Sequence, residues 1–193
     1  MIRTALAIVA LLICSQPLAA QDRAMAVPAV QAATSLPARA LVSSADPRAS
    51  AAGREMLAAG GSAVDAAMAT MLALTVVEPQ SSGIGGGGFL VHSDARTGAV
   101  ATIDGRETAP RAARPGRFLG PDGRPLPMGQ AVPGGLSVGV PGNIRLMAEA
   151  HRRWGRLPWS QLFQPAIRLA EEGYEANPWL VAALAMAGNH WQD

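Results

Sequence analysis

The sequence of 193 residues contains no lysine, so all 16 of its basic residues are arginines. Without lysine, the chain cannot form a Schiff base, supply a P-loop lysine or use a lysine as general base. Its one cysteine, Cys14, lies in an N-terminal segment that we expect to be removed on export. The mature chain is therefore predicted to lack disulfides, cysteine nucleophiles and thiolate metal ligands.

Aromatic residues are also scarce, at 4% of the sequence, and the arginines are scattered rather than clustered. This composition does not favour nucleic-acid binding, which relies on basic patches and on aromatic rings that stack against bases. The three histidines, at positions 92, 151 and 190, do not have the spacing of metal ligands. We therefore expect no metal, no other cofactor and no nucleic-acid partner.

The N-terminus has the pattern of a secretory signal peptide: an arginine at position 3, an apolar run over residues 5–13, and small residues before a cleavage site near Ala20. The apolar run is too short to cross a bilayer as a stable helix, so no stable membrane insertion is expected. We therefore predict a signal peptide over residues 1–20, a flexible leader over 21–39, and a periplasmic or secreted protein.

The folded part is predicted to begin with a short strand at residues 40–44. The Asp-Pro pair at 46–47 then supplies an N-cap and a first-turn proline for an alanine-rich helix, which ends at the Gly-Gly pair 60–61. Ser62 and Asp65 have the spacing of a capping box. They predict a second, largely buried helix with one apolar face.

Beyond the second helix, strands at residues 89–92 and 98–104 predict a hairpin, and a surface loop rich in proline, glycine and arginine follows. We interpret the loop arginines as solvating it; they are residues 111, 114, 117 and 124. One strand and three helices are predicted after the loop, at residues 137–140, 143–153, about 160–172 and from 178 onward. Helices packed on an antiparallel sheet make an α+β fold. Three tryptophans lie at the ends of predicted helices, and we expect their side chains to pack against the rest of the fold. They are at positions 154, 159 and 179.

Residues 83–88 form a glycine run that formally satisfies G-x-G-x-x-G. A dinucleotide site needs such glycines between a strand and a helix, but here a helix comes first and a strand follows, so that function is disfavoured. Two interpretations remain open. Either the glycines let the backbone pass tightly beside another element, or their N–H groups form a nest for a carboxylate or an oxyanion.

Arg106 leaves the second strand after a flexible glycine, in the sequence Asp104-Gly105-Arg106-Glu107. An arginine in this position can grip a carboxylate with its planar, two-pronged guanidinium. Alternatively, Arg106 can form a surface salt bridge with Glu107 or Asp104, which would stabilise the fold by at most about 1 kcal/mol. Spacing alone favours the salt bridge. His92, which shares a strand face with an apolar residue, is predicted to be structural.

Five motifs, in order and with compatible spacing, resemble the N-terminal part of the γ-glutamyltranspeptidases, also called glutathione hydrolases. They are VSS at 42–44, GGSAVDAA at 60–67, EPQSSGIGGGGF at 78–89, DGRETAP at 104–110 and VGVPG at 138–142. The segments WGRLPW at 154–159 and PAIRLAEEG at 165–173 continue the resemblance. It covers the chain from about residue 40 to its end.

The resemblance implies an N-terminal nucleophile (Ntn) hydrolase, a four-layer αββα sandwich made as a proenzyme and autocleaved into a large and a small subunit. In that family the γ-glutamyl group of glutathione or a related amide passes to a threonine at the new N-terminus of the small subunit. It then passes to water, an amino acid or a peptide. By the same resemblance, the arginine that binds the substrate α-carboxylate corresponds to Arg106.

The family's threonine nucleophile lies in a Thr-Thr-His context, which this sequence lacks. We therefore expect the nucleophile beyond Asp193 and no catalytic residue in this chain. Residues 40–193 are then a truncated part of the large subunit and inactive alone. A cephalosporin-acylase-like amidase of the same fold is an alternative, although Arg106 favours an α-amino-acid carboxylate. A non-catalytic binding or partner module is a third alternative.

Overall fold

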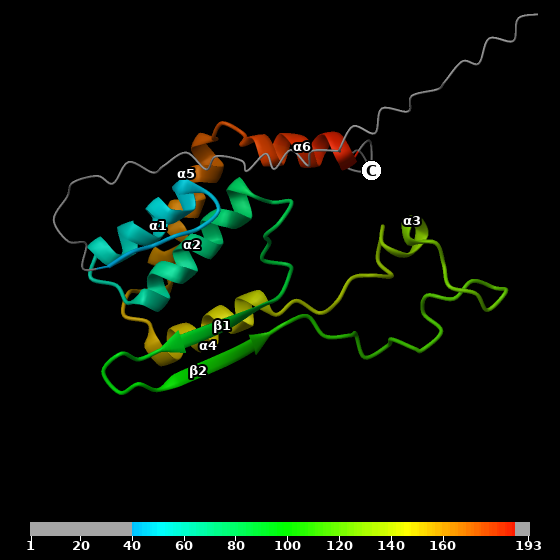
Figure 1. The fold of residues 1–193 in the computed structure, drawn as a ribbon, viewed down its shortest axis with the longest axis horizontal. Helices are drawn as coiled ribbons and strands as arrows, with labels where there is room; N and C mark the ends of the chain where they lie inside the picture. The colour runs from blue at the N-terminus through cyan, green and yellow to red at the C-terminus, as the bar shows by residue number, and fades with distance from the viewer. Residues whose placement is uncertain (1–39, 188–193) are drawn as a thin grey trace, which may run out of the picture. The chain divides into compact units, whose positions relative to one another are not determined.

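The computed structural model describes residues 40–187. The signal peptide predicted over residues 1–20 and the leader predicted over 21–39 lie outside the described residues, as does His190. Within the described part, helices pack on one another and on an antiparallel hairpin (Figure 1). This arrangement confirms the predicted α+β class.

Helices α1 (Pro47–Ala58) and α2 (Ala63–Val77) begin where the capping signals place them. The Asp46 carboxylate accepts a first-turn backbone N–H of α1 at 2.8 Å. Ser62 and Asp65 exchange both hydrogen bonds of a capping box at the start of α2. In each helix a capping side chain therefore satisfies one of the free N–H groups of the first turn, as the sequence predicts.

The two helices pack closely because the residues that face each other are small. A Cβ on Gly53 of α1 would lie 3.0 Å from the Ala66 carbonyl oxygen and closer still to the Thr70 hydroxyl, so a larger residue would push α1 and α2 apart. The core that they share with later helices is rich in small and flexible apolar side chains, which include Ala49, Ala52, Met56, Met68, Ala69, Leu72, Ala73, Met147 and Leu162.

The sheet of the described residues is the predicted hairpin, made by β1 (Gly88–Ser93) and β2 (Val100–Gly105). The strands are antiparallel, and their register pairs the first residue of β1 with the last residue of β2. Leu90 and Ile103 pack from the inner face toward the core. That face lies against α4 (Asn143–Trp154), as Figure 1 shows.

Four further helical segments were found: α3 (Met128–Ala131) in the long loop, then the 3-10 helix η1 (Trp159–Phe163), α5 (Gln164–Glu172) and α6 (Pro178–Ala187). The single helix predicted over about 160–172 is therefore two pieces. Pro165 explains the break, because proline suits the first turn of an α-helix but cannot donate a hydrogen bond to a preceding turn. Helix α5 lies beside α2 (Figure 1).

Residues 40–44 are not a strand, which corrects the expectation from sequence. Val42 packs instead against α1 next to Gly53. The Ser44 hydroxyl donates to the Asp46 carbonyl oxygen at 2.8 Å and lies 2.7 Å from the Ser50 hydroxyl. This segment is therefore held by the packing of Val42 and by the hydrogen bonds of Ser44 rather than by a strand partner, and β1 and β2 are the only strands of the described sheet.

Residues 137–140 are not a strand either. Only Val140 is paired, in an isolated bridge with Thr108 whose two backbone hydrogen bonds measure 3.3 and 2.8 Å. Pro141 follows directly and has no N–H to donate, so the pairing cannot extend. The bridge nevertheless closes the neck of the long loop between β2 and α4.

Two of the three tryptophans pack as the sequence predicts, and the third does not. His92 is structural, because its ring stacks on Trp154 with ring centroids 4.2 Å apart, where β1 meets α4. Trp159 packs edge-on against His151 at 5.3 Å. Trp179 differs from the expectation, since 74% of it is exposed in the described part of the chain. Helix α6 buries only Leu180 there, and its other large apolar side chains are exposed: Trp179, Val181, Leu184 and Met186.

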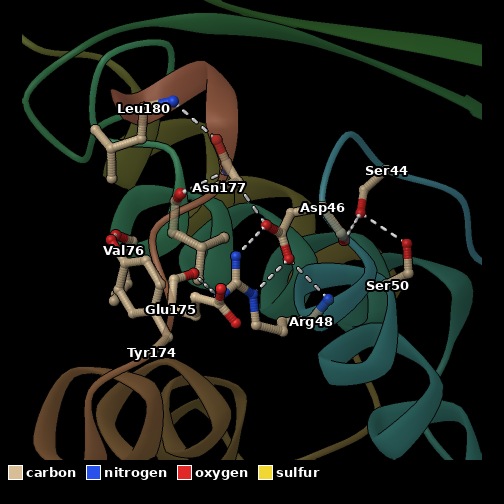
Figure 2. Close-up of polar contacts among 10 residues, drawn as sticks. Ser44, Asp46, Arg48, Ser50, Val76, Tyr174, Glu175, Asn177 and Leu180 are labelled. Carbon is tan, nitrogen blue, oxygen red and sulfur yellow. Dashed lines mark hydrogen bonds and ion pairs between the residues drawn. The ribbon is translucent and has the colours of Figure 1, made fainter. Parts of the chain in front are cut away.

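Asp46 also joins α1 to the segment before α6 (Figure 2). Arg48 grips its carboxylate with Nε at 2.9 Å and Nη2 at 2.6 Å, while Nη1 donates to the Glu175 carbonyl oxygen at 2.7 Å. The Asn177 amide lies 3.4 Å from the same carboxylate and 3.3 Å from the Val77 carbonyl oxygen. The hydrogen bonds from Arg48 lower the pKa of Asp46 from its ordinary 3.8 to about 2.

Candidate functional site

Arg106 is the first residue after β2, where the chain leaves the hairpin. Its backbone N–H donates to Asp104 Oδ1 at 2.9 Å, and this short turn fixes the direction in which the chain departs. The Asp104 carboxylate therefore accepts a backbone hydrogen bond and does not pair with the Arg106 guanidinium. The Arg106 side chain is 67% exposed, so its guanidinium is open to a ligand.

Three glycines from three motifs meet at the base of Arg106. A Cβ on Gly87 would lie 2.6 Å from the Glu107 nitrogen and 2.7 Å from the Gly105 carbonyl oxygen. A Cβ on Gly105 would lie 2.5 Å from an α4 side chain, and one on Gly142 would overlap the Gly105 carbonyl group. Because no side chain fits at these positions, glycine is what allows the three backbone segments to touch.

The glycine run is also fixed to the start of α4. The backbone N–H groups of Gly142 and Asn143 both donate to the Gly86 carbonyl oxygen, each at 3.0 Å. The buried Asn143 side chain donates from Nδ2 to the Gly83 carbonyl oxygen at 2.7 Å. These contacts support the interpretation in which the glycines allow tight packing beside another element.

Glu107 connects the glycine run to Arg106. Its Oε2 lies 3.3 Å from Arg106 Nε, so the salt bridge considered from sequence is present. The same carboxylate rests on the run, because a Cβ on Gly87 would lie 2.5 Å from Oε2 and one on Gly86 would lie 3.4 Å from Oε1. Within the described residues, Oε2 is buried and accepts no hydrogen bond, so Arg106 is its electrostatic partner.

A cleft of about 670 Å³ opens beside Arg106. Arg106, Arg114 and Arg117 all line it, while Glu107 is the one acid among its lining residues. The rest of the wall is mainly apolar or small and includes Pro110, Phe118, Leu136 and Val138. A mostly apolar cleft with an excess of guanidinium groups suits a small molecule that carries a carboxylate.

Arg117 does more than solvate the loop, which corrects the expectation from sequence. Its Nε donates to the Leu136 carbonyl oxygen at 2.6 Å and its Nη2 to the Gly135 carbonyl oxygen at 3.0 Å. It therefore ties the two sides of the loop together at the cleft. Arg124 behaves as expected, since it is 85% exposed and lies 3.9 Å from Asp122.

The sequence marks Arg106 as a candidate but not the residues that hold it. Its pattern indicates Glu107 only as a salt-bridge partner and indicates no role for Asn143. No local signal marks Asn143, because its partner Gly83 lies 60 residues earlier. In the part of the chain that the structure describes, no group of three or more His, Cys, Asp or Glu side chains is arranged to hold a metal.

Comparison with known proteins gives a consistent result. A sequence profile of the γ-glutamyltranspeptidase family matches residues 49–192. The glutathione hydrolase proenzyme of Bacillus subtilis (strain 168) is 43% identical over 145 residues, which are 75% of this chain and 25% of that protein. The crystal structure of Helicobacter pylori γ-glutamyltranspeptidase has a TM-score of 0.73 and 40% identity over 77% of this chain and 42% of that one.

A cephalosporin acylase from Bacillus halodurans is a more distant structural relative, with a TM-score of 0.61 and 33% identity over 83% of this chain and 31% of that one. The chain spans about a quarter of the length of the curated relatives that it matches. The matched segment contains all three motifs that meet at Arg106. The chain belongs to the γ-glutamyltranspeptidase family, and its α+β fold is part of the Ntn-hydrolase sandwich of that family.

Proposed function

We propose that this chain is part of an exported enzyme that transfers the γ-glutamyl group of glutathione and related amides, and that Arg106 binds the α-carboxylate of the donor. The observation that carries the proposal is the position of Arg106. Its exposed guanidinium stands where three family motifs meet, in a cleft lined by two further arginines. A guanidinium binds a carboxylate through two parallel hydrogen bonds, which fixes the orientation of the donor as well as its position.

The surroundings of Arg106 leave it available for this role. Glu107 approaches Nε, the nitrogen next to the side-chain stem, at 3.3 Å. Asp104 is occupied by a backbone N–H. A substrate carboxylate then binds at the terminal guanidinium nitrogens, which face away from the stem. The neighbouring Arg114 and Arg117 add positive charge to the cleft and increase its attraction for an anionic donor.

The nucleophile of the proposed reaction is a threonine on a small subunit released from the same precursor. The names of relatives support such processing, since several are called proenzymes. The threonine hydroxyl attacks the γ-carbonyl carbon while its own α-amine accepts the proton, and the α-amine then passes this proton to the amine of the donor, which leaves. Water, an amino acid or a peptide then takes the γ-glutamyl group. Arg106 contributes by holding the donor in place for both steps.

We also propose that the enzyme works in the periplasm or outside the cell. The signal-like N-terminus supports this location. In the described residues, none of the helices combines the length and apolar character needed to span a bilayer.

The amidase alternative has weaker support. The cephalosporin acylase matches this chain with a lower TM-score and lower identity than the Helicobacter pylori γ-glutamyltranspeptidase does. The two activities differ in the acyl group, so parallel assays with γ-glutamyl and glutaryl amides distinguish them. We expect the γ-glutamyl amide to be the better substrate, and preference for the glutaryl amide would favour the acylase.

Substitution of Arg106 by alanine in the full-length protein tests the proposal. Removing one member of a desolvated charge pair costs about 2 to 5 kcal/mol, so kcat/KM for a γ-glutamyl anilide should fall by about 30-fold or more. Arg124→Ala is the matched control, because Arg124 is an exposed loop arginine that does not line the cleft. Near-normal turnover by Arg106→Ala would refute the carboxylate role.

The coding sequence offers a second check. We expect an in-frame continuation past codon 193 that reaches a Thr-Thr-His segment. A stop codon directly after Asp193, together with a soluble and monodisperse product, would favour the non-catalytic module instead.

A further inference from the structure

We infer that Asn143 is a positioning residue for Arg106 and acts through the glycine run at residues 83–88 and Glu107. This inference rests on the proposed carboxylate-binding role of Arg106. It concerns a residue that touches neither the substrate carboxylate nor the reacting bond. Its effect on the reaction is therefore indirect and should be confined to substrate binding.

Asn143 is only 7% exposed and is the first residue of α4. Helix α4 has no side-chain cap, so this amide is not used to satisfy its own helix. Nδ2 instead donates to the Gly83 carbonyl oxygen at 2.7 Å, and the same oxygen accepts the Gly86 N–H at 3.3 Å. The Asn143 side chain therefore holds the turn from Gly83 to Gly86 in its observed shape. Buried hydrogen bonds of this kind are costly to leave unmade.

The turn from Gly83 to Gly86 also fixes the position of the Glu107 side chain. Gly86 is anchored to the start of α4 by two backbone hydrogen bonds of 3.0 Å. Gly87 follows, and it lies so close to Glu107 that a Cβ there would be 2.5 Å from Oε2. The position of the Glu107 carboxylate thus depends on the path of the glycine run. Glu107 then pairs with Arg106 at 3.3 Å.

Arg106 needs this support because it is long and exposed. An arginine side chain has about 2 kcal/mol of rotamer entropy, part of which is lost whenever it binds a ligand. A Glu107 carboxylate held in a fixed position reduces the number of rotamers that the free guanidinium samples. Without the Asn143 hydrogen bond, the turn relaxes and Glu107 shifts. The entropy lost in ordering Arg106 then makes the free energy of substrate binding less favourable.

The test measures kcat and KM for a γ-glutamyl anilide in the full-length enzyme carrying Asn143→Ala. We expect KM to rise by about 3- to 5-fold with kcat within about twofold of the wild type, because the carboxylate is bound equally in the ground state and the transition state. Asn143→Asp is the second variant. It keeps the volume and suits a helix N-terminus but cannot donate to the Gly83 carbonyl oxygen, so the same rise is expected.

Asn177→Ala is the matched control. Asn177 is also an asparagine whose amide reaches a distant backbone carbonyl, at Val77, but it lies in the network around Asp46 and does not line the Arg106 cleft. Its substitution should lower stability and leave KM unchanged. The same rise in KM for Asn177→Ala as for Asn143→Ala would overturn the inference in favour of general destabilisation.

A double substitution separates this inference from the proposed function. If Asn143 acts through Arg106, Asn143→Ala raises KM no further on the Arg106→Ala background. An equal rise on both backgrounds, an unchanged KM in the Asn143 variants, or failure of both variants to fold while Asn177→Ala folds would each overturn the inference and leave the proposed function standing. An Arg106→Ala enzyme with normal kinetics would instead overturn the proposed function, and the inference with it.

Discussion

The guanidinium of Arg106 and the carboxylate of Glu107 form an ion pair directly after β2, with Nε 3.3 Å from Oε2. Glu107 rests on Gly87, so the pair connects an exposed arginine to a tightly packed part of the backbone. Because Arg106 is mostly exposed, the pair contributes at most about 1 kcal/mol to stability. In our proposal its main effect is to orient Arg106 for the substrate carboxylate.

Glu107→Gln should therefore raise KM for a γ-glutamyl anilide by about 3- to 5-fold, with kcat little changed, because about 1 kcal/mol of orientation is lost. Glutamine keeps the shape of the side chain and removes its charge. The control is Glu55→Gln, which breaks an ion pair with Arg168 away from the cleft and should leave KM unchanged. A lower KM for Glu107→Gln would contradict this role and show that Glu107 competes with the substrate.

Gly87→Ala should destabilise the protein by about 1 to 3 kcal/mol, as expected for overpacking. The added Cβ would lie 2.6 Å from the Glu107 nitrogen and 2.7 Å from the Gly105 carbonyl oxygen, and backbone atoms cannot move aside cheaply. Gly85→Ala is the matched control from the same run, because a Cβ there meets no atom within 4 Å. Thermal unfolding of both variants checks the prediction, and equal melting temperatures would contradict it.

The Asp46–Arg48 pair predicts a dependence of stability on pH. Hydrogen bonds from Arg48 lower the pKa of Asp46 from 3.8 to about 2. A carboxyl group whose pKa is lowered on folding stabilises the protein above its unfolded pKa and loses that effect as pH falls through the folded pKa. The stabilisation by this pair, about 2 kcal/mol, should thus be complete above about pH 4 and largely lost near pH 2.

Asp46→Asn tests this dependence, because asparagine keeps the N-cap but loses the charge. The free energy of unfolding should be about 2 kcal/mol lower than in the wild type at pH 7, and the difference should shrink between about pH 4 and pH 2. Asp122→Asn removes an exposed carboxylate 3.9 Å from Arg124 and should show little difference at any pH. A difference for Asp46→Asn that is constant across this range would contradict the account.

The outer face of the hairpin predicts how residues 40–193 behave in isolation. Phe89, Val91 and Val100 are 68%, 69% and 65% exposed on this face. Exposed apolar clusters of this kind bind hydrophobic dyes and promote association. We expect the isolated segment to associate at micromolar concentration, as measured by analytical ultracentrifugation. Phe89→Thr with Val91→Thr should reduce the association, since threonine is polar and retains strand propensity.

Met128→Thr is the control for this experiment. Met128 is 74% exposed but lies on α3 in the long loop, away from the hairpin face. It should leave the association unchanged. A monomeric segment with cooperative two-state unfolding would contradict the prediction.

Elements with local signals are those that the sequence predicts correctly. The capping box of Ser62 and Asp65 and the alternating pattern of the hairpin involve residues close together in the chain. The strand predictions at 40–44 and 137–140 are wrong because apolar residues with strand propensity also suit other packing. Val42 packs on a helix, and Pro141 limits pairing to a single bridge.

The site shows the same division between local and long-range information. Arg106 is recognisable from its motif, and the order of elements around the glycine run disfavours a dinucleotide site. The contacts that surround Arg106 join segments separated by many residues, such as Asn143 with Gly83 and Gly87 with Glu107. Composition and spacing do not indicate which distant segments touch, so only the folded structure shows that the motifs meet.

The most direct test of the account compares two donors that differ only in the α-carboxylate, a γ-glutamyl anilide and a 4-aminobutanoyl anilide. If Arg106 binds that carboxylate, the wild-type enzyme should prefer the γ-glutamyl donor by about 30-fold or more in kcat/KM, and Arg106→Ala should lose most of this preference. An Arg106→Ala enzyme that keeps the wild-type preference would contradict the central claim.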